Sequence, residues 1–330
     1  MTKDRVLALL KESGDRYCSG EKMSQALGLS RAAVWKAVEG LRQEGYAIAS
    51  VPNRGYRLEG SPDRLSAGEL SGALEGCIIG RDLICLESVD STNNYLKKLA
   101  DEGAAHGTVV LCDQQTGGRG RRGNSFLSPA GKGLYLSVLL RPELPPQDVV
   151  NLTAWIAVAV CGAVEEAVGE RPGIKWTNDL ILHRKKLCGI LTELSLEGET
   201  GQLQYVVAGI GINVSQSAED FGPEVSQVAT SLEQALGRTV RRADLAAAVI
   251  RALDRLSRDF PAKKAEYLER YRAGCLTTGH EVRLIQKGVA RTAFAESIDD
   301  DFALVVRWPD GARETITAGD VSVRGLLGYV

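Results

Sequence analysis

Residues 117–123 combine four glycines with three arginines, Arg119, Arg121 and Arg122, between two apolar runs that are typical of strands. Glycine permits positive φ and a close approach of the backbone to a ligand, and arginine offers planar donors for phosphate and carboxylate. The run lacks the Lys-Ser or Lys-Thr of a P-loop and the glycine spacing of a dinucleotide-binding fold. Taken alone, it fits a small-molecule anion site, a disordered nucleic-acid-binding segment or a solvated loop.

The two apolar runs, at residues 108–112 and 133–140, decide between these interpretations. They place the arginine- and glycine-rich segment, here called the Arg/Gly loop, at the mouth of a sheet inside a folded domain, where ligands tend to bind. A disordered arginine tail would lie outside such a framework, so we expect a small-molecule anion site. Helix-like and strand-like segments alternate from residue 63 to 275, which predicts an α/β or α+β domain.

Length and composition limit the number of domains and the classes of protein that fit this chain. The 330 residues predict two or three domains, and a net charge of −2 excludes no partner because a basic patch fits within a neutral total. Seven scattered cysteines without metal-type spacing indicate reduced thiols. No signal peptide is recognisable, and the apolar run at 152–168 falls short of the roughly 20 residues of a membrane span. We expect a cytoplasmic protein without a membrane partner or a protein-built metal cluster.

The first sixty residues have the spacing of a helix-turn-helix. One helix ends at Gly14, a second spans about residues 20–27, and Ser30 caps a third. Short helix, glycine turn and capped helix form the helix-turn-helix pattern. Strand-like runs at 46–50 and 56–58 then predict a hairpin, the wing of a winged helix.

This module predicts DNA binding, with the start of the third helix near base edges and basic side chains on phosphates. The alternative is a three-helix module for protein contacts or dimerisation. Because the local excess of positive charge is small, one copy should bind weakly and a dimer on two half-sites should be required. The residues expected at DNA are Ser30, Arg31, Ala32, Trp35, Lys36, Arg54 and Arg57.

Three further clusters carry polar or small residues. Ser91 or Thr92 caps a helix, which is either a plain cap or a contact to the carbonyl or ureido groups of a ligand. Lys186 precedes an apolar strand and is expected to be a fixed, half-buried cation. Small residues at 209–211 allow close approach to a flat ligand, whose polar edges Asn213 can fix.

Taken together, these motifs resemble the biotin–protein ligases that also repress a biosynthetic operon. The resemblance covers essentially the whole chain, and the combination of motifs is specific although each piece alone is weak. In the family's order, the matches are Asp90-Ser91-Thr92-Asn93, Gln115 followed by the Arg/Gly loop, Lys175-Trp176-x-Asn178-Asp179, Lys186-Leu187-x-Gly189-Ile190 and Gly209-x-Gly211-Ile212-Asn213.

The resemblance implies an α+β multidomain fold. Its parts would be a winged helix-turn-helix over residues 1–62, a catalytic α/β domain with a mixed sheet over 63–275, and an SH3-like β-barrel over 276–330. Short alternating strands in the last part, separated by turns at 299–301 and 309–311, agree with a small antiparallel barrel.

The resemblance also implies a two-step reaction. Biotin's carboxylate attacks the α-phosphorus of ATP to give biotinyl-5′-adenylate and pyrophosphate, and a lysine of a biotin carboxyl carrier protein, an acetyl-CoA carboxylase subunit, then attacks the mixed anhydride. An anion approaching a polyanion requires fixed positive charge, which the loop arginines and Lys186 supply, with Mg²⁺ on the phosphates. The other implied partners are operator DNA and, with adenylate bound, a second copy of the chain.

Site residues follow from the resemblance position by position. The implied catalytic residues are Lys186, Arg119, Arg121 and Asp179, of which Asp179 would orient or deprotonate the acceptor lysine. Biotin is expected at Ser91, Thr92, Asn93, Gln115, Arg119, Gly120, Arg121 and Lys186. ATP and the adenylate are expected at Arg121, Arg122, Phe126, Asn178, Asp179 and Asn213.

Two departures from the family pattern concern the nucleotide. Thr177 stands where relatives often have proline, and Phe126 stands where they commonly have tryptophan, which leaves less aromatic area for adenine. Other functions stay open: a non-catalytic biotin-sensing repressor, a lipoyl- or octanoyl-transferring relative, and a ligase that has lost repression. Lys186 and the three arginines argue against the non-catalytic repressor. The glycine pattern argues against the lipoyl- or octanoyl-transferring relative, and the winged helix argues against a ligase that has lost repression.

Overall fold

The computed structural model describes residues 2–286, 289–317 and 321–325. The chain forms two compact units. The first, the N-terminal unit, is Met1–Cys77 together with Arg241–Ala247, and the second, the larger unit, is Ile78–Val240 together with Ala248–Val330. The division into three domains inferred from the sequence stays a prediction.

The N-terminal unit has the predicted helix-turn-helix with a hairpin. Its elements are α1 (Thr2–Ser13), α2 (Gly20–Leu27), α3 (Arg31–Gln43), β1 (Ala47–Val51) and β2 (Gly55–Gly60). The hydroxyl of Ser30 accepts from the Ala33 amide and so caps α3, as predicted. Gly28 ends α2 in the left-handed region with φ 65°, where glycine avoids the Cβ clash.

The apolar faces of these three helices meet in one core. Val6 and Leu10 of α1 and Val34 and Val38 of α3 are fully or almost fully buried there. Because Val34 and Val38 lie one turn apart on the buried face, the opposite face of α3 is left to solvent. Trp35 is accordingly 58% exposed.

The segment Arg241–Ala247 is tied into the N-terminal unit by partly buried polar contacts. The Asp63 carboxylate accepts from the Arg242 amide at 2.8 Å and from Arg242 Nε at 2.7 Å, and the Arg242 side chain is almost completely buried. Glu69, on the short helix α4 (Ala67–Leu70), is also buried and forms ion pairs with Lys11 of α1 and with Arg241. These ion pairs join segments far apart in the sequence.

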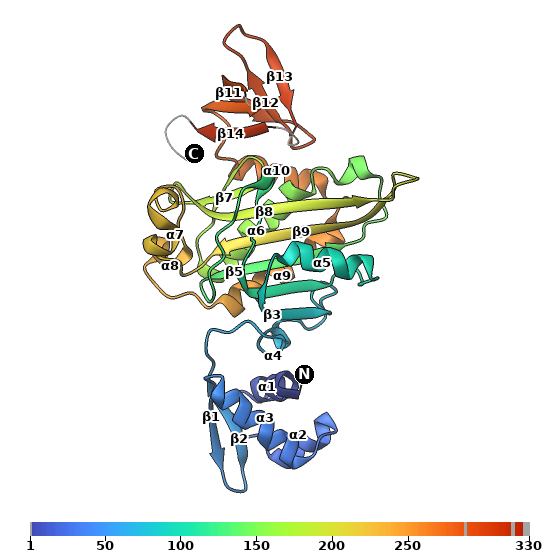
Figure 1. Cartoon of the computed structure of the whole chain (residues 1–330), viewed down its shortest axis with the longest axis vertical. Coiled ribbons are helices and arrows are strands. Elements are labelled where there is room, and N and C mark those ends of the chain that lie inside the picture. Colours follow the sequence, from blue (N-terminus) through green and yellow to red (C-terminus); the bar gives the residue numbers. More distant parts are fainter. Residues whose placement is uncertain (1, 287–288, 318–320, 326–330) are drawn as a thin grey trace. The chain divides into compact units, whose positions relative to one another are not determined.

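A seven-stranded mixed sheet forms the centre of the larger unit, in the order β3-β4-β5-β9-β8-β7-β6 (Figure 1). Strands β3 and β4 are parallel and the remaining pairs are antiparallel. The bounds are β3 Leu83–Val89, β4 Val109–Gln115, β5 Gly133–Leu140, β6 Gly173–Lys175, β7 Asp179–Leu182, β8 Lys185–Leu196 and β9 Leu203–Asn213.

Helices pack around this sheet. They are α5 (Thr92–Asp101), α6 (Leu152–Val168), α7 (Ala218–Val225), α8 (Leu232–Leu236), α9 (Arg242–Asp259, of which the part from Ala248 belongs to this unit) and α10 (Lys264–Gly274). Leu96 and Ala100 of α5 pack on strand residues in one buried cluster. The stretch Pro146–Val168 is long and apolar enough to cross a membrane by composition, but 67% of its most apolar window is buried, as in a core helix.

A second, five-stranded antiparallel sheet lies at the end of the chain, in the order β13-β12-β11-β10-β14. Its strands are β10 Glu281–Gln286, β11 Val289–Ile298, β12 Leu304–Arg307, β13 Arg313–Ile316 and β14 Val321–Gly325. The sequence predicted the first four strands and missed β14. Of the region predicted to form a barrel, residues 287–288, 318–320 and 326–330 lie outside the described part of the chain.

Candidate functional site

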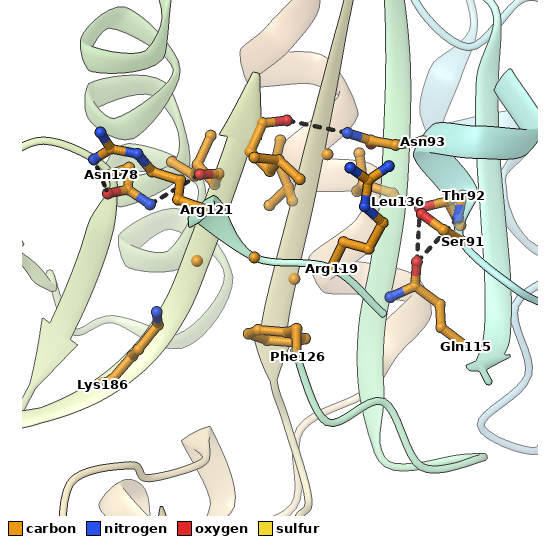
Figure 2. A pocket seen from close by; sticks show the side chains of 17 residues that line it. Ser91, Thr92, Asn93, Gln115, Arg119, Arg121, Phe126, Leu136, Asn178 and Lys186 are labelled. Atoms are coloured by element: carbon orange, nitrogen blue, oxygen red, sulfur yellow. Dashed lines mark hydrogen bonds between the residues drawn. The ribbon is translucent and has the colours of Figure 1, made fainter. Parts of the chain in front are cut away.

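A pocket with an empty volume of about 500 Å³ opens on the central sheet (Figure 2). Its walls are the start of α5, the end of β4, the Arg/Gly loop with Phe126, the turn between β6 and β7, and residues of β5, β8 and β9. The predicted site residues that line it are Ser91, Thr92, Asn93, Gln115, Arg119, Gly120, Arg121, Phe126, Asn178 and Lys186. Stretches far apart in the sequence thus meet in one place.

Three predicted residues lie outside that lining. Asp179 forms an ion pair at 2.8 Å with Lys186, which does line the pocket. Asn213 is buried and donates to the Thr230 carbonyl oxygen at 3.0 Å. Arg122 extends from the loop to the Ile285 carbonyl oxygen of β10 at 3.4 Å.

The floor of the pocket requires glycine. A Cβ at Gly209 would lie 2.3 Å from the Asn93 side-chain oxygen, and one at Gly211 would lie 2.6 Å from the Phe126 ring. Real Cβ atoms do not approach other atoms so closely, so a larger residue at either position would require the neighbouring side chain to shift. The flat group that lies over Gly211 in this structure is the Phe126 ring itself, which stands edge-on to Tyr135.

One end of the pocket is a fixed polar network. The Gln115 side-chain oxygen accepts from the Thr92 amide at 3.0 Å and from the Thr92 hydroxyl at 3.1 Å. The Ser137 hydroxyl, on β5, lies 2.7 Å from the Thr92 hydroxyl and 2.6 Å from the Asn93 side-chain oxygen. Ser91 is the N-cap residue of α5 by position, but its side chain makes no capping bond, so the hydroxyl is available to a ligand. No pattern in the sequence marked Ser137.

The Arg/Gly loop is a compact turn held by its own backbone. The Gly120 amide donates to the Asn124 carbonyl oxygen at 2.7 Å, and the Phe126 amide donates to the Gly118 carbonyl oxygen at 2.9 Å. Arg122 lies in the left-handed region with φ 59°, which is unusual for a residue with a side chain. The loop therefore presents its three arginines in a defined geometry.

Each of the three loop arginines reaches a different part of the larger unit. Arg119 Nη1 donates to the Asn94 side-chain oxygen of α5 at 2.9 Å. Arg121 Nη1 donates to the Asn178 side-chain oxygen at 3.1 Å and to the Thr177 hydroxyl at 3.3 Å, both in the turn between β6 and β7. With the contact of Arg122 to β10, the loop is attached at three separate points.

Burial shapes the charges around this pocket. Desolvation lowers the pKa of Arg121, and the neighbouring Arg122 lowers it further, whereas Asp179 acts in the opposite direction. A cation that is partly stripped of water interacts strongly with an anion. The described lining holds Arg119, Arg121 and Lys186 and no carboxylate, so the site favours an anionic ligand.

The geometry agrees with what is known of similar proteins. A model of the biotin/lipoate A/B protein ligase family matches residues 85–213, and a helix-turn-helix model matches residues 2–57. The chain is 36% identical to a bifunctional ligase/repressor BirA of Bacillus spizizenii, over 95% of this chain and 96% of that protein. The chain belongs to the biotin–protein ligase family.

Two further members of the biotin–protein ligase family extend the comparison. The bifunctional ligase/repressor BirA of Escherichia coli is 32% identical, over 97% of this chain and 96% of that protein. The structure of the biotin protein ligase of Aquifex aeolicus in complex with biotin and ATP superposes with a TM-score of 0.64 at 30% identity, covering 74% of this chain and 99% of that one. The predicted family and fold class are confirmed.

A second, larger cleft of about 1660 Å³ shares a wall with the pocket of this ligase-family chain. Arg121 and Asn178 line both, and Thr177 lines the cleft. Asp299 and Phe302, from the turn between β11 and β12, also line the cleft. The terminal sheet thus supplies part of the surroundings of the site.

The predicted DNA-binding residues lie on α3 and on the hairpin. Ser30 is the N-cap of α3, and Arg31, Ala32, Trp35 and Lys36 lie in its first two turns. All five are exposed, as is Arg54 at the hairpin tip. The guanidinium groups of Arg54 and Arg57 lie 4.6 and 4.9 Å from the centre of the Tyr17 ring. Tyr17, which the sequence-based prediction overlooked, therefore fixes the two hairpin arginines side by side. Arg57 also pairs with Glu59.

Proposed function

We propose that this protein is a biotin–protein ligase and a biotin-regulated repressor. It would form biotinyl-5′-adenylate from biotin and ATP, and would transfer biotin to a lysine of the biotin carboxyl carrier protein of acetyl-CoA carboxylase. The observation that carries the proposal is the convergence of a neutral hydrogen-bonding end and a cationic end in one pocket. The names of the similar proteins, which are ligases and ligase/repressors, support it.

The neutral end suits the ureido head group of biotin, which has one carbonyl acceptor and two N–H donors. The hydroxyls of Ser91 and Thr92 and the amide of Gln115 offer both donors and acceptors at this end. Asn93 and the backbone around Arg119 and Gly120 would complete the contacts. The existing bonds from Thr92 to Gln115 hold these groups in place before a ligand arrives.

The cationic end suits the carboxylate of biotin and the phosphates of ATP. In the first step a carboxylate oxygen bonds to the α-phosphorus, and the bond from that phosphorus to the pyrophosphate oxygen breaks. Arg119, Arg121 and Lys186 would offset the charge repulsion of this approach. Because the described lining has no carboxylate, the Mg²⁺ would enter on the phosphates of ATP. Its chemistry there would be to neutralise phosphate charge.

The nucleotide would extend along the shared wall of the two cavities. Arg121 and Asn178, which line both, would hold the adenylate, with Arg122, Asp179 and Phe126 beside it. The Asn213 amide donates to the Thr230 carbonyl oxygen. Its role would therefore be to support the nucleotide end of the pocket through this buried hydrogen bond. Arg121 would retain the reactive intermediate until the carrier lysine arrives.

Two roles for Asp179 fit its ion pair with Lys186. As inferred from the sequence, it would orient or deprotonate the acceptor lysine during transfer. The 2.8 Å contact also supports a role in adenylation, because it fixes the Lys186 ammonium group at the edge of the pocket. The two roles affect the two half-reactions differently, which makes them separable by experiment.

The N-terminal unit would bind operator DNA through α3 and the hairpin, with Ser30, Arg31, Ala32, Trp35, Lys36, Arg54 and Arg57 at the contact. A homodimer formed with adenylate bound would present two such modules to two half-sites. The seven cysteines are all free thiols, which supports a cytoplasmic location.

Purified protein with ATP, Mg²⁺, labelled biotin and an apo carrier domain tests the enzyme. Label on the carrier lysine together with pyrophosphate release is the expected result. Pyrophosphate without transfer would indicate an adenylate-forming sensor instead, and the absence of both products would refute the proposed reaction. Operator binding is tested separately by DNA retention with and without biotin and ATP.

A further inference from the structure

Glu193, on β8, lies outside the pocket lining but contacts two residues that line it. One of its carboxylate oxygens accepts from Asn93 Nδ2 at 2.8 Å, and the other accepts from Lys97 Nζ at 2.9 Å. The second oxygen also lies 3.6 Å from Arg119 Nη1. One carboxylate therefore joins β8 to α5 and to the Arg/Gly loop.

The surroundings of Glu193 keep it ionised. Its side chain is only 23% exposed, and burial alone would raise its pKa. The hydrogen bonds from Lys97 and Asn93 and the charges of Lys97 and Arg119 outweigh burial and hold the pKa of Glu193 below its usual range. At neutral pH the carboxylate thus faces two cations, and this corner of the site keeps a net positive charge for an incoming anion.

We propose that Glu193 is a positioning residue that fastens the Arg/Gly loop over the bound ligand through Arg119. The loop is attached at three points, and the attachment through Arg119 includes this ion pair as well as the bond to Asn94. Glu193 also fixes the Asn93 amide, whose oxygen lies 2.3 Å from the position that a Cβ of residue 209 would take. The inference rests on the proposed ligase function, because the ligand that the loop retains is the adenylate.

The variant E193Q tests the inference. Glutamine keeps an acceptor and nearly the same shape but removes the charge that pairs with Arg119. A matched control is E296Q, because Glu296 is 18% exposed, pairs with Arg307 and Arg313, and lies in the terminal sheet away from the pocket lining. Loss of a partly exposed ion pair predicts about a 3- to 5-fold faster release of the adenylate from E193Q, and no change for E296Q.

The measurement is the dissociation of preformed, labelled biotinyl adenylate from the full-length protein after dilution into unlabelled adenylate. Rising salt, from about 0.1 M to about 1 M, should narrow the difference between wild type and E193Q, because it screens the ion pair. The double variant R119A/E193Q should release the adenylate no faster than R119A alone. If the effects of R119A and E193Q on the release rate are additive, Glu193 does not act through Arg119. This result would overturn the inference.

The outcomes separate the inference from the proposed function. Wild-type protein that forms no adenylate refutes the ligase function. Wild-type protein that forms adenylate and releases it at the same rate as E193Q, or more rapidly, refutes the role of Glu193. If E193Q melts at a lower temperature than E296Q, the salt dependence of wild-type protein decides. Adenylate release from folded wild-type protein should then accelerate with salt. A release rate that does not change with salt refutes the proposed ion pair between Glu193 and Arg119.

Discussion

The contact of Phe126 with Gly211 makes the position of the Arg/Gly loop measurable without any ligand. In G211A the new methyl carbon would lie 2.6, 2.8 and 3.2 Å from three carbons of the Phe126 ring. Ordinary carbon contacts are about 3.5–4.0 Å, and Gly211 is fixed in the sheet between β5 and β8. The Phe126 ring must therefore move. Because the ring belongs to the loop, we expect residues 117–126 to be displaced with it.

Overpacking of this kind costs about 1–3 kcal/mol. If this cost destabilises only the conformation in which Phe126 lies over Gly211, the population of molecules with the loop displaced rises by about 5- to 150-fold. The three loop arginines make limited trypsin digestion a direct assay, because trypsin cleaves after arginine only where the backbone is accessible. We expect G211A to be cut within residues 119–122 faster by this factor, with little change in the urea midpoint of the whole protein.

Two companion variants make the result decisive. G162A is the control, because a Cβ at Gly162 would meet no atom within 4 Å, and it should be cut at the wild-type rate. F126L removes the ring carbons that clash, so G211A should accelerate cleavage much less in the F126L background. Equal cleavage of G211A and wild type, or the same acceleration in the F126L background as with Phe126 present, would refute the reasoning.

Three further outcomes are expected. D179N should slow transfer to the carrier more than adenylation if Asp179 serves the acceptor lysine, whereas equal slowing in single-turnover assays would favour a role only through Lys186. R121G removes the bonds to Thr177 and Asn178, so adenylate should escape and label unrelated lysines; an unchanged release rate would contradict the clamp. D63A leaves the buried Arg242 without its carboxylate, and urea unfolding should show a loss of about 1–3 kcal/mol, reduced from the fully buried case because Asp63 is partly exposed.

Local signals explain what the sequence predicted well. The bounds of α2 and the cap of α3 follow from Gly28 and Ser30, which act on their own neighbours along the chain. Strand β5 and helix α6 are continuous apolar runs, and their different lengths distinguish the strand from the helix. The Arg/Gly loop and Lys186 were found because their residue types fit the chemistry of an anion site, and the structure places both at one pocket.

Contacts between distant strands explain what the sequence did not predict. Ser137 and Glu193 reach the site only because β5, β9 and β8 are neighbours in the sheet, and nothing next to them in the chain marks them as special. The hydroxyl of Thr177 became a partner of Arg121 through the same long-range folding. Strand β14 pairs with β10 and lies at the far edge from β13, an arrangement that its five residues alone do not specify.

The inclusion of Arg241–Ala247 in the N-terminal unit affects how this protein can be dissected or recombined. A gene fusion that exchanges only the first sixty residues would take Lys11 and Glu69 from different parents, although both belong to one ion-pair cluster with Arg241. A deletion through Cys77 would leave Arg242 without Asp63. A chimaera that reads a new operator should therefore carry over residues 63–77 and 241–247 from the same parent as the helix-turn-helix.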